Sequence, residues 1–195
     1  MTGERIKGKE LVKCGLATHF VSSNKIDSLK NALIEISDDN VDYQKLHQIC
    51  NNYADLVYDA KEFYFPNMGE INKIFLHDNL IDCIKRIKTL SIEGNEENKK
   101  WANNILKILS SYSPISLLLH FEQIKKGIKI TTLNEAYDLE LKLIYKYKIN
   151  LIRILEGNEL VEGIRALLVE KDNKPNWKYK SVEEINEIEL FKEYF

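Results

Sequence analysis

The stretch TLNEAYDLELKLIYKYKINLIRILE, residues 132–156, carries the longest helical pattern in the chain. Thr132 and Glu135 stand at the spacing of a capping box, in which each side chain accepts a hydrogen bond from the other residue's backbone amide. A helix of this length is a rod of about 40 Å, and Gly157 should end it. Because residues 139–155 are apolar on most sides, we expect the rod to be buried against several neighbours.

Most of the remaining chain also has helical spacing, interrupted by polar, glycine or proline breaks. Ser113 followed by Pro114 favours a helix start, since serine can accept a hydrogen bond from an orphan amide and proline has no amide to lose there. Ser181 and Glu184 have capping-box spacing at the start of a terminal helix. The apolar positions that define the other helices are Ile26, Leu29, Leu33 and Ile36; Tyr43, Leu46, Cys50, Tyr53 and Val57; Ile71, Ile74 and Phe75; Leu80, Ile84 and Ile87; and Trp101, Ile105, Ile108 and Leu109.

Only the start of the chain predicts anything other than helix. The segment LATHFV, residues 16–21, is rich in β-branched and aromatic residues and is followed by the polar cluster SSN, which is typical of a strand. A lone strand leaves backbone donors and acceptors unpaired along both edges, and the sequence offers no obvious partner strand. The predicted fold class is therefore mainly α, with one short N-terminal strand from Leu16 to Val21.

The composition is that of a globular chain. Of the 195 residues, 44% are hydrophobic and 30% are charged, and the formal net charge is only -2, so no field that would recruit nucleic acid or an anionic membrane is expected. The three cysteines are odd in number and widely spaced, which favours reduced thiols in an intracellular compartment. No apolar run is long enough to span a membrane, and the first residues do not read as a signal or transit peptide.

No motif in the sequence predicts a catalytic or metal site by itself. Ser113 is not part of a G-x-S-x-G elbow, no cysteine has the surroundings of a nucleophile, and the scattered glycines form no phosphate-binding loop. Aromatic residues within 137–147 lie at helical spacing, which favours packing in a core over base stacking. None of the four histidines stands at the spacing of a zinc site; they are His19, His47, His77 and His120.

Two clusters have an order that helix propensity does not explain. The first, TGERIKGKELVKCGLATHFV at residues 2–21, resembles a segment of the 3-hydroxyisobutyryl-CoA hydrolases, a branch of the crotonase superfamily, written LTG-x-R-[IL]-x-G-x-[DE]-[LV]-x-x-x-GLATHFV. The matching residues are Thr2, Gly3, Arg5, Gly8, Glu10, Gly15, Leu16, Ala17, Thr18, His19, Phe20 and Val21.

The second cluster, VEGIRALLVEKDNKPNW at residues 161–177, is similar to the EG-[VI]-RA-[LV]-L-[IV]-x-KD-x-x-P-x-W signature of the same hydrolases. Its matching residues are Glu162, Gly163, Arg165, Ala166, Leu167, Lys171, Asp172, Pro175 and Trp177. Between the clusters, an SP-x-SL helix with a Q-[LI]-x-x-G end and a T-L-x-E helix also fit, through Ser113, Pro114, Ser116, Leu117, Gln123, Gly127, Leu133, Glu135, Glu140 and Leu143. The resemblance covers essentially the whole chain in order.

The resemblance implies a crotonase fold, in which a spiral of ββα turns precedes a helical C-terminal region, and hydrolysis of a β-hydroxyacyl-CoA thioester in valine breakdown. In such proteins the catalytic Glu, the catalytic Asp and the oxyanion-hole amides lie upstream of the TG motif. No residue here inherits those roles, so we expect no catalytic residue in this chain. We expect Glu140, on the long helix, to be a paired structural carboxylate, with Arg165 a partner of the right kind.

The loop after the second cluster is the predicted coenzyme A contact. By resemblance this region contributes an aromatic surface and a basic residue toward the adenine and phosphates, so Trp177 would stack on the ring while Lys171, Lys174 or Lys178 meets phosphate oxygens. Coenzyme A enters as part of the substrate, and no covalent cofactor is expected. The alternative is that Trp177 packs the terminal helix onto the body of the protein.

The predicted organisation is a last piece of spiral core at residues 1–22 and a helical C-terminal region at residues 23–195. The predicted function is the C-terminal portion of an acyl-CoA thioester hydrolase that is not catalytic by itself. One alternative is an inactive hydrolase-like structural subunit of a larger assembly such as a mitochondrial ribosome, and another is an enoyl-CoA hydratase or isomerase relative. Expected partners are an acyl-CoA, an upstream core or other subunit, and further copies of the chain; the resemblance also implies a mitochondrial location.

Overall fold

The computed structural model describes five stretches of the chain and divides them into two compact units, one within residues 3–66 and one within residues 67–195. All regular structure in the described residues is helical, so the prediction of a mainly α chain is confirmed. The described stretches, of which 147–153 is described in its backbone, are residues 6–36, 42–55, 68–76, 78–153 and 159–195.

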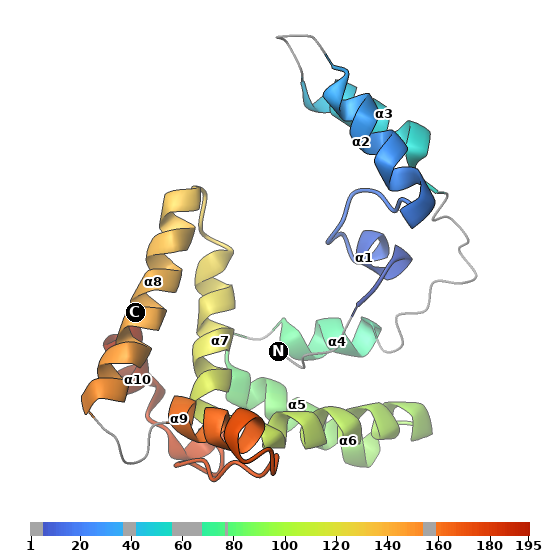
Figure 1. Cartoon of the computed structure of the whole chain (residues 1–195). Helices are drawn as coiled ribbons and strands as arrows, with labels where there is room; N and C mark the ends of the chain where they lie inside the picture. Colours follow the sequence, from blue (N-terminus) through green and yellow to red (C-terminus); the bar gives the residue numbers. More distant parts are fainter. Residues whose placement is uncertain (1–5, 37–41, 56–67, 77, 154–158) are drawn as a thin grey trace. The chain divides into compact units, whose positions relative to one another are not determined.

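The unit within residues 3–66 is a short helix followed by a helical hairpin. Its elements are α1 (Lys9–Lys13), the 3₁₀ turn η1 (Ser23–Lys25), α2 (Ile26–Ile34) and α3 (Tyr43–Tyr53). Helices α2 and α3 pack against each other (Figure 1). None of the described residues in this unit is fully buried, so contacts other than a hydrophobic core must hold its segments together.

One carboxylate holds the two ends of the hairpin together. The side chain of Asp55 accepts hydrogen bonds from the backbone amide of Ser22 at 2.7 Å, from the Ser22 hydroxyl, and from Lys25 Nζ at 2.6 Å. These bonds hold the pKa of Asp55 at about 2, and the bond from Lys25 has the largest effect, followed by the bond from the Ser22 hydroxyl. The segments before α2 and after α3 are therefore joined by a charged cluster.

The predicted strand over residues 16–21 does not form, and this prediction was wrong. The Phe20 carbonyl accepts a single bond from the Asp55 amide at 2.8 Å, and the Ala17 amide donates to the Leu11 carbonyl at 3.1 Å. No described residue forms a second strand beside this segment. Its backbone groups therefore use turn bonds and one long-range bond, because β-branched residues make a strand only where another strand supplies partners.

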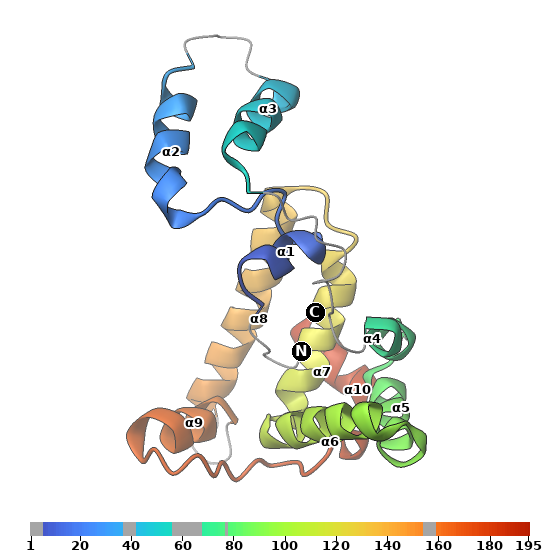
Figure 2. The same ribbon diagram turned by 90° about the vertical axis from the view of Figure 1, so that its right-hand side faces the viewer.

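The unit within residues 67–195 is an assembly of helices around a shared core. Its α5–α6 hairpin lies at the N-terminal end of α7 (Figures 1 and 2). The elements are α4 (Met68–Phe75), α5 (Leu80–Glu93), α6 (Glu96–Ser111), α7 (Pro114–Gly127), α8 (Leu133–Arg153), α9 (Glu159–Ile164), the π-helix η2 (Arg165–Val169), the 3₁₀ turn η3 (Val182–Glu184) and α10 (Glu187–Tyr194).

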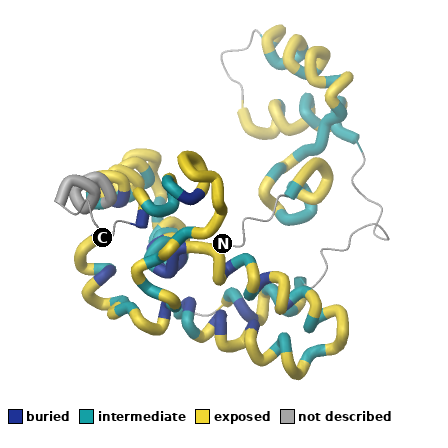
Figure 3. The backbone as a smooth tube through the Cα atoms, turned by 60° about the horizontal axis from the view of Figure 1, so that its bottom comes forward, coloured by how far each residue is buried: buried dark blue, intermediate teal, exposed yellow. Residues whose placement is uncertain are grey.

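Every fully buried residue among those described belongs to this unit (Figure 3). Helices α5 and α6 each present several apolar residues to the core at helical spacing, which is why their period could be read from the sequence. The buried hydrophobic cluster is Ile74, Leu80, Cys83, Ile84, Ile87, Ala102, Ile105, Leu109, Leu117, Leu118, Leu119, Leu143, Val182, Leu190 and Tyr194.

Local capping patterns placed two of the three helix starts that they predicted. Helix α7 begins at Pro114, and Ser113 Oγ accepts the Ser116 amide at 3.1 Å. At the start of α8 the reciprocal Thr132 and Glu135 bonds form at 3.3 and 3.0 Å. These two predictions are confirmed. The predicted ending of α8 near Gly157 lies outside the described residues.

The predicted start of the last helix was wrong. Ser181 precedes only the turn η3 and makes no capping bond through its side chain to that turn's backbone. Helix α10 begins six positions later, where Asn186 Oδ1 accepts the Glu189 amide at 3.4 Å. Asparagine accepts this bond as well as serine does, so the local pattern did not distinguish the two starts.

Helix α8 is far more exposed than predicted. Of its described side chains only Leu143 is buried, whereas Leu141, Ile144 and Tyr145 are each 60% or more exposed. The expectation of burial on several sides is thus wrong for the described part of α8. No helix among the described residues is long and apolar enough to cross a membrane.

Candidate functional site

One guanidinium group joins the residues of the C-terminal signature. Arg165, the first residue of η2, donates from Nε and Nη2 to the two carboxylate oxygens of Glu162 at 2.9 and 2.7 Å. Its Nη1 donates to Asp172 at 3.0 Å and to Glu170, and its Nη2 also donates to the Lys174 carbonyl at 3.2 Å. Only the planar fork of arginine can serve so many acceptors at once.

These contacts keep the acidic members ionised. Hydrogen bonds from Arg165 and from the Asn176 amide hold the pKa of Glu162 at about 2. The Lys174 amide and then Arg165 lower the pKa of Asp172, while Glu162 and Asp172 raise the pKa of Arg165. A carboxylate with so low a pKa cannot hold a proton at neutral pH, so the network is suited to fixing a loop and not to acid catalysis.

The same network shapes the loop that follows η2. The Asn176 amide donates to Glu162 Oε1 at 2.6 Å, and the Asn173 amide donates to the Ala166 carbonyl at 3.1 Å. Lys171 and Asn173 have φ of 56° and 54°. The left-handed region is unfavourable for lysine, so the Arg165 contacts must compensate for the strain at this turn.

Trp177 connects the end of α6 to α9. Its Nε1 donates to the Ser111 carbonyl at 3.2 Å. Its ring lies against Gly163, where a Cβ atom would come within 3.2 Å of Cη2. The glycine of the EG motif therefore makes room for the tryptophan at the end of the same signature.

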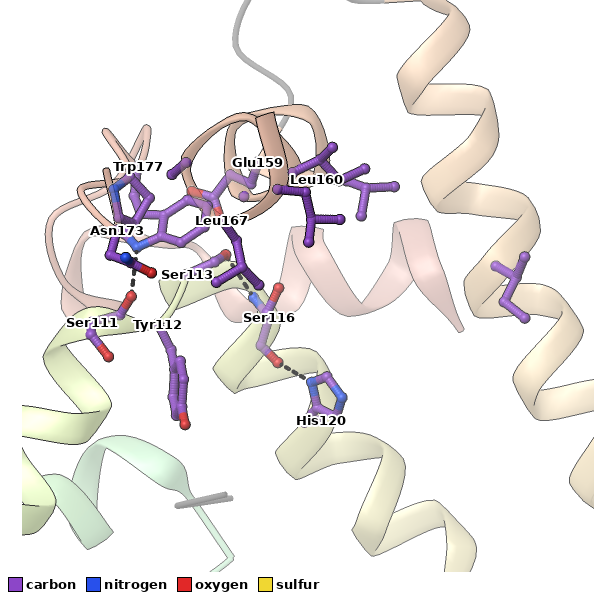
Figure 4. Close-up of a pocket in the computed structure, with 16 residues that line it drawn as sticks. Ser111, Tyr112, Ser113, Ser116, His120, Glu159, Leu160, Leu167, Asn173 and Trp177 are labelled. Atoms are coloured by element: carbon purple, nitrogen blue, oxygen red, sulfur yellow. Dashed lines mark hydrogen bonds between the residues drawn. The ribbon is translucent and has the colours of Figure 1, made fainter. Parts of the chain in front are cut away.

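A pocket of about 800 Å³ opens beside these residues (Figure 4). One face of α7 forms part of the wall, with Ser113, Ser116 and His120 one turn apart, and α9, η2 and the loop after η2 form most of the rest. The lining residues are Ser111, Tyr112, Ser113, Ser116, His120, Ile144, Glu159, Leu160, Gly163, Ile164, Ala166, Leu167, Leu168, Asn173, Pro175 and Trp177. Pockets of this size accommodate small organic ligands.

Glu159, the first residue of α9, is the acidic group in the pocket wall. It is buried, and burial raises the pKa of its carboxyl group. Sequence reasoning missed it, since nothing in the local pattern indicates that a glutamate at a helix start will be covered from outside. Its burial depends on the loop after η2 folding back, which is a long-range event.

The predicted coenzyme A residues are only partly brought together. Trp177 lines the pocket, whereas the lysines are not among its lining residues. Lys174 contributes its backbone to the Arg165 network, and Lys178 Nζ lies 5.2 Å from the centre of the Tyr179 ring. Contact of Trp177, Lys171, Lys174 or Lys178 with coenzyme A stays a prediction.

The expected partnership of Glu140 with Arg165 was wrong. Glu140 is exposed and accepts a hydrogen bond from Gln123 Nε2 at 2.6 Å, and Arg165 is fully engaged elsewhere. The sequence did contain a signal for the true network. Glu162 stands one helical turn before Arg165, which is the spacing of an ion pair on one face of a helix.

The histidines that the structure describes do not gather with other ligands. The rings of His19 and His47 have centroids 4.6 Å apart, and His120 Nδ1 lies 2.8 Å from the Ser116 carbonyl oxygen. Within the described stretches no group of three or more His, Cys, Asp or Glu side chains is arranged to hold a metal ion. His77 lies outside the described residues.

The fold and the sequence place the chain in a known class of protein. The family model for enoyl-CoA hydratase/isomerase proteins matches residues 1–195, and the chain therefore belongs to that family. Two solved structures support the fold. An enoyl-CoA hydratase from Rhodobacter sphaeroides 2.4.1 is similar with a TM-score of 0.67 and 23% identity, over 99% of this chain and 49% of that one. A carnitinyl-CoA dehydratase from Mycobacterium thermoresistibile is similar with a TM-score of 0.63 and 22% identity, over 100% of this chain and 49% of that one.

Within the family, similar curated relatives carry a more particular name. The chain is 33% identical over 195 residues to the mitochondrial 3-hydroxyisobutyryl-CoA hydrolase of Dictyostelium discoideum, covering 100% of this chain and 47% of that protein. It is 30% identical over 190 residues to the mitochondrial enzyme of the same name from Xenopus laevis, covering 96% and 45%. It is 28% identical to 3-hydroxyisobutyryl-CoA hydrolase-like protein 1, mitochondrial, of Arabidopsis thaliana, covering 100% and 46%. The chain thus spans about half the length of the curated relatives it matches.

Proposed function

We propose that this chain supplies the C-terminal half of a 3-hydroxyisobutyryl-CoA hydrolase-like acyl-CoA thioester hydrolase. The observation that carries the proposal is the match of the whole chain to hydrolases of this name. The Arg165 network supports it, because Glu162, Arg165 and Asp172, which resemble the hydrolase signature, are the residues that build the loop beside the pocket. Hydrolase names among the relatives favour this function over that of a structural subunit.

The two halves of the complete protein would supply different parts of the active site. Hydrolysis of a thioester needs donors aimed at the developing oxyanion and a base within reach of the nucleophile. By resemblance both lie upstream of the TG motif, with residues 1–22 completing the spiral core. Residues 23–195 then contribute helical architecture and part of the coenzyme A site, with coenzyme A as a portion of the substrate and no covalent cofactor.

A thiol-release assay on purified protein tests the proposal. The 195-residue chain alone should not hydrolyse 3-hydroxyisobutyryl-CoA above background, since loss of a single oxyanion donor already costs about a hundred-fold or more in rate. Mixed with a separately expressed upstream half of the Dictyostelium relative, it should restore measurable turnover. Turnover by the chain alone that survives repurification contradicts the proposal, and so does a reconstituted mixture that releases no thiol.

We further infer that Trp177, with Lys171, Lys174 or Lys178, contacts coenzyme A in the complete protein. Trp177→Ala should weaken coenzyme A binding by about 1–3 kcal/mol if the ring stacks on adenine. Trp101→Phe, a change at the other tryptophan, on α6, is the control and should leave binding unaltered. If Trp177→Ala lowers thermal stability and leaves the affinity unchanged, Trp177 serves only to pack the loop.

Location and partners are part of the same proposal. The relatives named above are mitochondrial by name, and we place the complete protein in that organelle; a native protein that fractionates with another compartment would contradict this. The exposed apolar surface of α8 is suited to packing against the rest of the fold or against further copies of the chain. Lysine substitutions at Leu141 and Tyr145 test for self-association through this surface, with light scattering as the measurement.

A further inference from the structure

Glu159 is a buried carboxyl group in the pocket wall, and among the described residues neither of its oxygens has a hydrogen-bond partner of good geometry. The residue is 9% exposed, and both carboxylate oxygens are buried. The backbone of Tyr179 and Lys178 and the Lys178 ammonium group lie close enough to act on its charge. These groups lower the pKa of the Glu159 carboxyl and so partly offset the rise that burial causes. A buried carboxylate in this state is costly unless something else supplies a donor.

Other polar groups of the wall are already engaged. Ser113 Oγ accepts the Ser116 amide, His120 Nδ1 faces the Ser116 carbonyl, and Trp177 Nε1 donates to Ser111. Because a carbonyl oxygen only accepts, His120 Nδ1 carries a proton, which leaves the other ring nitrogen an acceptor in the neutral ring. The wall therefore offers acceptors at Glu159 and His120.

Most of the remaining wall is apolar. Leu160, Ile164, Leu167 and Leu168 of α9 and η2 line the pocket, and so does Ile144 of α8; Figure 4 shows Leu160, Leu167 and Glu159 among the lining residues. The Leu167 and Leu168 residues are 61% and 62% exposed. An apolar molecule seated here would remove that surface from water, at about 25 cal/mol for each Å² covered.

We propose that this pocket binds a small molecule with an apolar body and a hydrogen-bond donor head, N–H or O–H, that pairs with Glu159. The donor satisfies the carboxylate, and the body covers the leucines. A carboxylate head is disfavoured, because beside an ionised Glu159 it would place two negative charges together in a site of low dielectric. This binding site does not depend on the proposed hydrolase activity, and its failure leaves that proposal untouched.

Titration with a matched series of eight-carbon probes tests the proposal. The chain has two tryptophans, so Trp101→Phe leaves Trp177, in the pocket wall, as the reporter of fluorescence. Octylamine and octanamide should change its emission saturably, and octanoate should bind at least about tenfold more weakly. Binding of the amine alone shows that the head must be a cation, whereas binding of both shows that a neutral donor suffices; either result supports the site.

Glu159→Gln separates the carboxylate from the apolar wall. The change keeps an acceptor oxygen and removes the charge, so octylamine affinity should fall by about tenfold while octanamide affinity changes by less than about threefold. Glu96→Gln, the same change at a side chain that is 95% exposed on α6, is the control and should alter neither. Ser116→Phe, which places a ring in the pocket, should abolish binding of all the probes.

The measurements remain decisive if a variant is unstable. Circular dichroism reports whether each variant keeps its helices, and calorimetric titration of the unchanged chain replaces fluorescence if Trp101→Phe unfolds. The proposal is overturned if octanoate binds as tightly as octylamine and octanamide. It is also overturned if Glu159→Gln leaves the relative affinities unchanged, or if the folded chain gives no saturable response to any probe.

Discussion

Arg165 makes five hydrogen bonds to four residues, and lysine cannot reproduce that geometry. We therefore expect Arg165→Lys to loosen the loop after η2, lower Tm by about 3–6 °C and shift Trp177 emission to longer wavelength. Thermal melts and fluorescence spectra measure both effects. Arg86→Lys, at an exposed arginine of α5, should change Tm by less than about 1 °C. Equal shifts in Tm for the two variants would show that the Arg165 network does not contribute to stability.

Glu159 should make the chain less stable as the pH rises. Its pKa is raised by burial, so above the unfolded value of 4.5 the unfolded chain releases a proton that the folded chain keeps, and stability falls until the folded pKa is passed. Glu159→Gln removes this cost. Its Tm should exceed that of the unchanged chain by about 2–4 °C at pH 7.5 and match it near pH 4. A variant less stable than the parent at pH 7.5 contradicts the predicted sign.

Asp55 affects the pH dependence of stability in the opposite direction from Glu159. Its pKa is lowered from 3.8 to about 2, so its contribution to stability is fully present above about pH 4 and is lost as the pH falls through 2. The protection factors of the Ser22 and Asp55 amides, which correct for the intrinsic pH dependence of hydrogen exchange, should fall within that window in the unchanged chain. In Asp55→Asn the two amides should exchange faster already at pH 7, with no further change in the window. Continued protection in the variant would show that the cluster does not hold the hairpin ends.

At the scale of the elements, local signals were more reliable than long-range ones, although the Ser181 pattern marked only a turn and not the start of α10. The starts of α7 and α8 could be predicted, because a capping bond spans only three residues, from Ser113 to Ser116 or from Thr132 to Glu135. The strand at residues 16–21 could not be excluded, because its absence depends on the absence of a partner elsewhere. The burial of Glu159 and the contacts of Arg165 likewise depend on where a later loop folds.

The apolar side of α8 predicts association. Tyr137, Leu141, Ile144 and Tyr145 recur at helical spacing and are 58–63% exposed. We expect the chain to form larger species with rising concentration, and we expect Leu141→Lys with Tyr145→Lys to shift it toward the monomer, as measured by light scattering. Asp138→Lys, which introduces the same side chain on the same helix, is the control. A chain that is monomeric at every concentration contradicts the prediction.

At the scale of the whole molecule, the two units differ in what holds them together. The described residues of 67–195 surround a buried cluster, whereas those of 3–66 contain no fully buried side chain. Leu118→Ala should therefore cost residues 67–195 about 2–5 kcal/mol, since Leu118 is 1% exposed. Protection of the α2–α3 hairpin should be unaffected when hydrogen exchange is followed by mass spectrometry. Equal loss of protection in both units would show that they unfold together.

The π-helix η2 makes the number of residues between α9 and the loop matter as much as their identity. Its wide turn is closed by the Glu170 amide, which donates to the Arg165 carbonyl at 2.8 Å, five positions back. Deleting one residue, such as Leu168, would let the helix continue in ordinary α geometry and turn everything beyond it by about 100° around the helix axis. Glu170 and Asp172 would then point away from Arg165. Insertions and deletions should accordingly be absent from this segment in related chains that keep the arginine, even where its exposed leucines are freely exchanged.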